Sequence, residues 1–305
     1  MLFFISLLSF VAIHSAPNSF LSGGELNPNM TPEAIEKLKA IYGADKPLTT
    51  QYFDWLKSML KFDFGISFVS GKDVSETIVE RLGLTLFLNI TTLLSVFSLS
   101  LYLGIKSALN LNSKTDFFIR QFSLLSFSMP SFYLALILLL GLSVNLELFP
   151  LAGLHSLEEK EGVYNYLDML WHLIIPLSVM IFVSLGTMII YIRSLTLEIL
   201  KSDYYFFALS RDIPKKKLLY NYIVPNLLPP LITLLGLSVP ALIGGSVILE
   251  SIFGLEGMGQ LFYMSALSRD YPVIMGILMI SAFLTLLGNM LADMLLLKLN
   301  PYMKR

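Results

Sequence analysis

The sequence contains five apolar runs that are each long enough to cross a lipid bilayer. A hydrocarbon core of about 30 Å requires about 20 helical residues. A soluble fold of 305 residues could not bury this much apolar surface, because 55% of the residues are hydrophobic and only 14% are charged. We therefore predict an all-α membrane protein, with spans over residues 82–108, 117–144, 169–192, 224–249 and 272–297.

A sixth apolar run, residues 2–13, is shorter than the other five. A helix of this length reaches only about 18 Å, and no basic residue precedes it, as a secretory signal would require. We interpret residues 1–16 as the first of six transmembrane helices, truncated at its N-terminal side, with a signal sequence or an interfacial helix as alternatives. The predicted organisation continues with an extracytoplasmic loop containing short helices (17–81), a five-span core (82–298) and a cytoplasmic tail (299–305).

The lysines and arginines of the short loops are divided unequally between the two sides of the predicted spans. Cytoplasmic loops carry an excess of these residues, so the richer side is predicted to be cytoplasmic, together with both termini. The opposite short loops hold only Lys160 and Arg269 among several acidic residues. The cytoplasmic set is Lys106, Lys114, Arg120, Arg193, Lys201, Arg211, Lys215, Lys216, Lys217, Lys298, Lys304 and Arg305.

The segment predicted to be extracytoplasmic carries two helix signals. Thr31 is a capping residue, Pro32 suits the first helical position, and Gly43 suits the stop of a short helix. A second helix is predicted over residues 50–60, and aromatic residues cluster on it and on the residues that follow. These aromatics lie either at the lipid headgroups or in a small cap packed on the spans.

A basic island, residues 193–217, separates the predicted spans 169–192 and 224–249. Ser202 or Asp203 can cap a short helix, which should end by Asp212 or Ile213 because Pro214 disfavours helical geometry in the residue before it. Aromatic residues and arginine commonly anchor interfaces. The island therefore indicates a helix presented to a cytoplasmic partner, with a solvated basic loop as the alternative. The predicted contact face is Tyr204, Phe207, Ala208 and Arg211, at spacings of three and four.

An ordered series of short motifs resembles the dipeptide, oligopeptide and nickel permease family of ABC importers, from one end of the chain to the other. The motifs are Asn29-Met-Thr-Pro-Glu, Asp63-Phe-Gly-Ile-Ser67, Met129-Pro-Ser-Phe-Tyr133, Phe149-Pro-Leu-Ala-Gly153, His172-Leu-Ile-Ile-Pro176, Glu250-Ser-Ile-Phe-Gly-Leu-Glu-Gly-Met-Gly-Gln260, Arg269-Asp-Tyr-Pro272 and Asn300-Pro301.

The resemblance implies a permease fold in which the island forms a coupling helix that docks on a separate ATP-hydrolysing subunit. The residues assigned to docking are Asp203, Tyr204, Phe207, Ala208, Arg211, Asp212 and Ile213. The implied partners are a second homologous permease, two ATPase subunits and an extracytoplasmic solute-binding protein, within the lipid of the inner membrane. Asp212 departs from the family pattern, which has glycine there, so this position is expected to need a left-handed backbone.

No catalytic or metal-binding constellation is found in the sequence. The phosphate-binding pattern Gly-x-x-x-x-Gly-Lys-Ser/Thr is absent, so ATP and magnesium are expected on the partner subunit and no cofactor on this chain. The chain has no cysteine, which excludes thiol chemistry, and no nucleic-acid partner is expected. An ion-coupled secondary transporter is the alternative function, but it would need intramembrane charges and usually repeated halves.

Prolines and small residues mark the places where the predicted spans should bend or pack closely. Pro130 is expected to bend the span 117–144, while Pro225, Pro229, Pro230 and Pro240 are expected to interrupt the span 224–249. Bent helices suit a translocation pathway. The residues assigned to that pathway are Met129, Ser131, Gly244 and Ser246.

Overall fold

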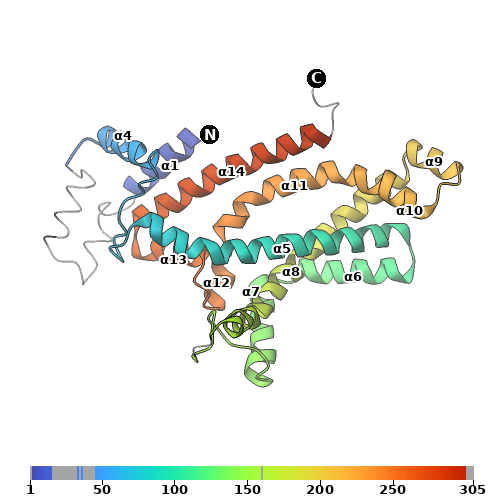
Figure 1. The fold of residues 1–305 in the computed structure, drawn as a ribbon, viewed down its shortest axis with the longest axis horizontal. Coiled ribbons are helices and arrows are strands. Elements are labelled where there is room, and N and C mark those ends of the chain that lie inside the picture. Colours follow the sequence, from blue (N-terminus) through green and yellow to red (C-terminus); the bar gives the residue numbers. More distant parts are fainter. Residues whose placement is uncertain (1, 16–32, 34–35, 37–44, 159–160, 300–305) are drawn as a thin grey trace. The chain divides into compact units, whose positions relative to one another are not determined.

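The structure is a computed structural model that describes residues 2–15, 33, 36, 45–158 and 161–299. Its described elements are helical, apart from an isolated bridge between Ile66 and Asp73. Figure 1 shows the helices in chain order. They are α1 (Leu2–His14), α4 (Leu48–Met59), α5 (Val74–Leu109), α6 (Lys114–Ser128), α7 (Ser131–Leu138), η1 (Leu139–Asn145), α8 (Val163–Leu200), α9 (Asp203–Ser210), α10 (Lys215–Leu218), η2 (Leu219–Ile223), α11 (Val224–Gly244), α12 (Val247–Ile252), α13 (Met258–Ser268) and α14 (Tyr271–Leu299).

Four stretches in the described residues are long and apolar enough to cross a membrane: Val74–Leu109, Val163–Leu200, Lys215–Ser238 and Tyr271–Met294. A fifth becomes possible if the bent pair Lys114–Ser128 and Ser131–Asn145 counts as one span. Helix α1 has 13 residues and belongs to the shorter apolar helices. The all-α membrane fold is confirmed, while the count of six transmembrane helices stays a prediction.

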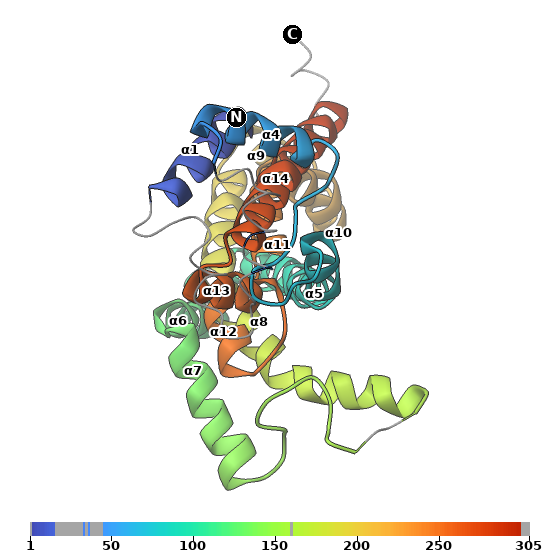
Figure 2. The ribbon, with the colours of Figure 1, turned by 90° about the vertical axis from the view of Figure 1, so that its left-hand side faces the viewer.

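The bend predicted at Pro130 is confirmed, but it is sharp enough to break the expected span 117–144 into two helices. The axes of α6 and of the helix that follows differ by 97°, and Figure 2 shows α7 running away from α6. Met129 is extended, with φ −84° and ψ 122°. Helical geometry is disfavoured in a residue before proline, so the helix ends at Ser128 and restarts at Ser131.

The helix that corresponds to the predicted span 224–249 differs from the prediction in its middle and at its end. Contrary to the prediction, Pro225, Pro229, Pro230 and Pro240 all lie within the helical stretch and do not interrupt it. The π-helical turn η2 precedes Pro225, and its longer hydrogen-bond spacing carries the ladder past a residue that has no N–H. The helix instead ends at Gly244, because Gly245 takes a φ of +64° that a helix cannot continue.

The chain divides into two compact units. Unit 1 comprises residues 1–86, 239–251 and 256–287, and unit 2 comprises residues 87–238, 252–255 and 288–305. The core of unit 1 joins α1 and α4 to the first turns of α5, to α13 and to the start of α14. In this core the side chains of Tyr52, Met59, Phe64 and Phe68 are buried. The aromatic residues Tyr52, Phe64 and Phe68 are therefore part of a packed cap, while Phe53 and Phe62 stay exposed.

The predicted helix over 50–60 is confirmed as α4. The helix predicted to start at Thr31 and to end at Gly43 lies outside the described residues apart from Glu33 and Glu36, which are helical. The tail 300–305 also lies outside the described residues.

Two distant motifs of unit 1 meet in a buried contact that we call the Ser67–Asp270 clasp. The Ser67 hydroxyl donates to Asp270 Oδ2 at 2.5 Å, and the Phe68 N–H donates to Asp270 Oδ1 at 2.9 Å. Burial raises the pKa of the Asp270 carboxyl, and these hydrogen bonds oppose that shift. The clasp closes the loop 62–70 onto the start of α14.

Glu250 organises the glycine-rich turn after α12 in unit 1. Its Oε2 accepts from the Gln260 N–H at 2.9 Å, and its Oε1 accepts from Thr85 Oγ1 at 3.3 Å. A Cβ on Gly257 would lie 2.6 Å from the Glu250 carboxylate, so only glycine allows this approach. Burial raises the pKa of Glu250 against the pull of these hydrogen bonds. These contacts hold the turn that follows α12 in place.

Unit 2 packs α5, α6 and α8 together through close approaches of their backbones. A Cβ on Gly104 of α5 would lie 2.8 Å from Ile192 Cγ2, and a Cβ on Gly186 of α8 would overlap the Ser123 carbonyl oxygen of α6. The Gly186 N–H donates to Ser126 Oγ at 2.8 Å. Small residues and interhelical hydrogen bonds of this kind hold membrane helices together, and here they fix the helix that leads to the island.

Candidate functional site

The predicted island helix is present as α9, eight residues long, between the end of α8 and the short helix α10 (Figure 1). Its N-cap is Ser202, which has the extended backbone typical of that position. The Ser202 hydroxyl makes no capping bond, however, and donates to the Ile199 carbonyl at 2.5 Å instead. Asp203 lies in the first turn, where a negative charge favours the helix dipole.

The exposed face of α9 differs by one residue from the predicted one. Tyr204, Phe207 and Arg211 are exposed as expected. Ala208 is only 3% exposed, so it packs against its own chain and cannot belong to a free contact face. Phe206, which the sequence reasoning missed, is 67% exposed, as is Phe207. The solvent-facing aromatic set is therefore Tyr204, Phe206 and Phe207.

The end of α9 has the backbone geometry that the glycine pattern predicted. The helix ends at Ser210, and Arg211 is its C-cap. Asp212 takes a φ of +50°, and its N–H donates to the Leu209 carbonyl at 3.1 Å. Ile213 is half-buried and leads through Pro214 into α10. A left-handed residue thus closes the helix, although the chain places aspartate there.

A recess of about 290 Å³ lies beside the start of α9 within unit 2. It is lined by the last turns of α8, including Leu195 and Glu198, and by Ser202, Tyr204 and Asn226. Carboxylate, hydroxyl and amide groups therefore lie next to the exposed aromatic face. This combination offers polar contacts around apolar anchors, as protein interfaces usually do.

The base of α9 rests on an apolar cluster. Ile105, Ile192, Ile199 and Ile223 are buried there, and Tyr205 packs against the cluster from α9 itself. The cluster joins α5, α8, η2 and α11. A force applied to α9 would therefore reach the long helices through packed side chains rather than through a loose loop.

A buried ion pair braces α8 about two turns before its C-terminal end, and the sequence did not predict it. Arg193 Nε and Nη2 donate to the two carboxylate oxygens of Asp116 at 2.8 and 3.0 Å. The Ser107 hydroxyl donates to Asp116 Oδ1 at 2.5 Å, and the Asn112 N–H donates to Oδ2 at 3.0 Å. Arg193 was assigned only to the cytoplasmic charge excess, but it ties α8 to the turn between α5 and α6.

The four residues assigned to the pathway fall into two pairs. Met129 and Ser131 flank the sharp bend of unit 2, and both are half-buried. Gly244 ends α11 in unit 1, and the Ser246 N–H donates to Glu250 Oε1 at 3.3 Å. Their bends and breaks are present, and their place along a pathway stays a prediction.

Comparison with known families matches nearly the whole chain. Residues 100–305 match the family described as "Binding-protein-dependent transport system inner membrane component". Residues 1–89 match the corresponding N-terminal family, described as "Binding-prot-dependent transport system membrane comp, N-term".

Individual relatives agree with these matches. The oligopeptide transport system permease protein AppB of Bacillus subtilis (strain 168) is 37% identical over 97% of this chain and 93% of the relative. The dipeptide transport system permease protein DppB of Lactococcus lactis subsp. cremoris (strain MG1363) is 31% identical over 98% and 94%. The metal-staphylopine import system permease protein CntB of Staphylococcus aureus (strain NCTC 8325 / PS 47) is 32% identical over 91% and 85%. The chain therefore belongs to the ABC importer permeases that form the inner-membrane component of binding-protein-dependent transport systems.

Proposed function

We propose that this permease forms the translocation pathway for peptides or for nickel and other metal chelates, delivered by an extracytoplasmic binding protein. The names of the relatives support this range of substrates. Two of the names refer to oligopeptide or dipeptide transport, and one refers to metal-staphylopine import. Oligopeptides are the first substrates to test, because the relative with 37% identity is an oligopeptide permease.

In this proposal the chain pairs with a second homologous permease and is driven by two ATPase subunits. ATP and magnesium belong to those subunits, and this chain binds no cofactor. Both termini and α9 face the cytoplasm, which the distribution of lysines and arginines supports. Met129, Ser131, Gly244 and Ser246 lie along the pathway.

The observation that carries the docking role is the exposed aromatic face of α9. Phe206 and Phe207 are each 67% exposed on a short helix whose base is firmly packed. Exposed aromatics on a rigid support are costly in water and anchor interfaces well. Closure of the ATPase subunits would push on α9, and the packed cluster beneath it would pass the motion to the spans. Each conformation of the importer is then favoured by its own contacts at this surface.

A pair of matched substitutions tests this docking role. Phe207→Ala removes an exposed aromatic from α9, whereas Phe53→Ala removes one of similar exposure, 64%, from α4. Loss of an interface anchor costs about 2 kcal/mol, or roughly 30-fold in affinity. We expect Phe207→Ala to lower copurification of the ATPase subunit and uptake, and Phe53→Ala to leave both unchanged. Equal copurification in the two variants, with equal membrane insertion, would refute docking through α9.

The substrate is tested separately by uptake in a strain that lacks this permease. Labelled dipeptide, oligopeptide and nickel are offered to cells with and without the restored chain. Peptide or nickel uptake that returns with the chain supports the proposal, and restored uptake of neither would contradict it.

A further inference from the structure

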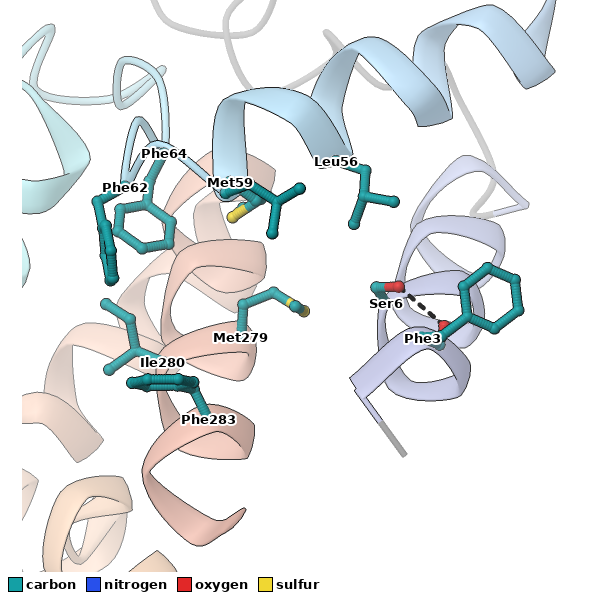
Figure 3. A pocket seen from close by; sticks show the side chains of 10 residues that line it. Phe3, Ser6, Leu56, Met59, Phe62, Phe64, Met279, Ile280 and Phe283 are labelled. Atoms are coloured by element: carbon teal, nitrogen blue, oxygen red, sulfur yellow. Dashed lines mark hydrogen bonds between the residues drawn. The ribbon is translucent and has the colours of Figure 1, made fainter. Parts of the chain in front are cut away.

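The recess beside the start of α9 has a size and a chemistry that suit one polar side chain. Its volume of about 290 Å³ lies just below the range of ligand pockets, about 300–1,000 Å³. Its walls are Leu195, Glu198, Ile199, Ser202, Tyr204 and Asn226. It differs from the recess of unit 1 in Figure 3, whose described lining is apolar apart from Ser6, and the Ser6 hydroxyl already donates to the Phe3 carbonyl.

The polar groups of the α9 recess are left chiefly as hydrogen-bond acceptors. The Ser202 hydroxyl donates its hydrogen to the Ile199 carbonyl at 2.5 Å, and Asn226 Nδ2 donates to the Tyr222 carbonyl at 2.6 Å. Lone pairs remain on Ser202 Oγ and Asn226 Oδ1, and an ionised carboxylate such as that of Glu198 can only accept. An occupant with several N–H donors therefore matches the recess.

Glu198 gives the recess a negative charge that its own chain does not neutralise. The residue is exposed, and it has no ion pair among the residues that the structure describes, not even with Lys201 three positions later. It lies in the last turn of α8, which contains no basic residue. An acid at this end of a helix opposes the helix dipole. A cation in the recess would therefore compensate both the carboxylate and the end of α8.

The Tyr204 side chain adds an aromatic wall to the recess. It is 43% exposed and also belongs to the aromatic face of α9. Cations bind over the faces of aromatic rings, and arginine does so most often. A guanidinium carries five N–H donors in one plane and stays charged, whereas an ammonium carries three donors. Of the cationic side chains, arginine therefore fits these walls best.

We propose that an arginine side chain of the ATPase subunit enters this recess and pairs with Glu198 beside the ring of Tyr204. This inference rests on the proposed docking of α9, because a partner that covers Tyr204, Phe206 and Phe207 also reaches the recess. The aromatic residues supply apolar contact, and the charge pair fixes the orientation of the partner. Since Glu198 belongs to α8, the pair joins the ATPase subunit directly to a long helix as well as to α9.

Removal of the charge at constant shape tests the pair. Glu198→Gln keeps the size of the side chain, and Glu147→Gln makes the same change at an exposed acid between η1 and α8. Dissociation of the ATPase subunit from the purified complete importer is followed on dilution, at low and at high salt. We expect Glu198→Gln to weaken binding about tenfold, as the loss of one charge-assisted hydrogen bond does, and to reduce its salt dependence. Glu147→Gln should match the wild type in both measurements.

Phe207→Ala separates a failure of this inference from a failure of docking. If Glu198→Gln binds like the wild type while Phe207→Ala binds more weakly, the arginine pair is wrong and docking through α9 stands. If neither variant weakens binding, both proposals are refuted.

A crosslinking experiment identifies the occupant of the recess. Asn226 is replaced by photoreactive benzoylphenylalanine, intact membranes are irradiated, and the crosslinked peptide is identified by mass spectrometry. The expected product is this chain joined to an ATPase peptide that contains an arginine. Replacing that arginine by glutamate should weaken binding, and adding Glu198→Arg should restore it. A crosslink to a second permease or to a lipid, an ATPase peptide without arginine, or a charge exchange that restores nothing would overturn the proposal.

Discussion

The buried pair between Arg193 and Asp116 should be essential for the stability of unit 2. Arg193→Ala leaves a carboxylate that is 0% exposed without its guanidinium partner. Breaking a buried ion pair from one side costs about 3–5 kcal/mol. The Arg193 side chain keeps 17% exposure, which lets water partly replace it, so we expect a loss near the lower limit, about 3 kcal/mol. Two hydrogen bonds from Ser107 and Asn112 remain to the carboxylate.

Arg120→Ala is the matched control. Arg120 also approaches Asp116, at 3.7 Å, but its side chain is 46% exposed, so its loss should cost less than about 1 kcal/mol. Thermal unfolding of the purified protein in detergent, followed by size-exclusion chromatography, measures both variants. The double variant Arg193→Ala, Asp116→Ala should lose less unfolding free energy than the single variants Arg193→Ala and Asp116→Ala lose together, because the two side chains interact directly. Equal stability of Arg193→Ala and Arg120→Ala would refute the assignment of the pair as a brace.

Three further outcomes follow from local geometry. Gly186→Ala forces a Cβ into the Ser123 carbonyl oxygen, so it should cost about 1–3 kcal/mol in thermal unfolding, whereas Gly83→Ala, which meets nothing within 4 Å, should cost nothing. The pKa of Glu250 is raised above its usual 4.5. The stability advantage of the wild type over Glu250→Gln should therefore be greatest below pH 4.5 and should disappear as the pH rises through the folded-state pKa. A difference in melting temperature that does not change with pH would contradict this. Asp212→Gly should relieve about 1 kcal/mol of strain in the left-handed backbone and preserve or raise coupled transport. Asp212→Val should lower coupled transport. Abolished uptake by a glycine variant that still inserts in the membrane would show that the end of α9 is wrongly assigned.

The features predicted best from the sequence are those fixed by neighbouring residues. Ser202 and Pro214 bracket α9 in the sequence, and the helix lies between them as expected. The left-handed Asp212 followed from a family pattern of glycine at that position, and its φ of +50° agrees. The bend at Pro130 was likewise local, because proline acts on the residue directly before it.

The features that could not be predicted depend on residues far apart in the chain. Asp116 and Arg193 are 77 residues apart, so no helical spacing relates them. Ala208 shares a helical face with Tyr204 by spacing, yet its burial is set by tertiary packing that no local pattern encodes. The prediction for Pro225, within α11, was wrong for a related reason. The effect of this proline on the helix depends on the π-helical turn that precedes it.

The Ser67–Asp270 clasp sets a time order for the synthesis of this protein. Its two residues are 203 positions apart, which corresponds to about 10–40 s of translation at about 5–20 residues per second. During that interval the ribosome produces most of unit 2. The Ser67 hydroxyl and the Phe68 N–H lack their acceptor until Asp270 has been synthesised. The synthesis of unit 1 therefore begins first, but its last segment is made late. A chain that stops before residue 270 cannot form the clasp.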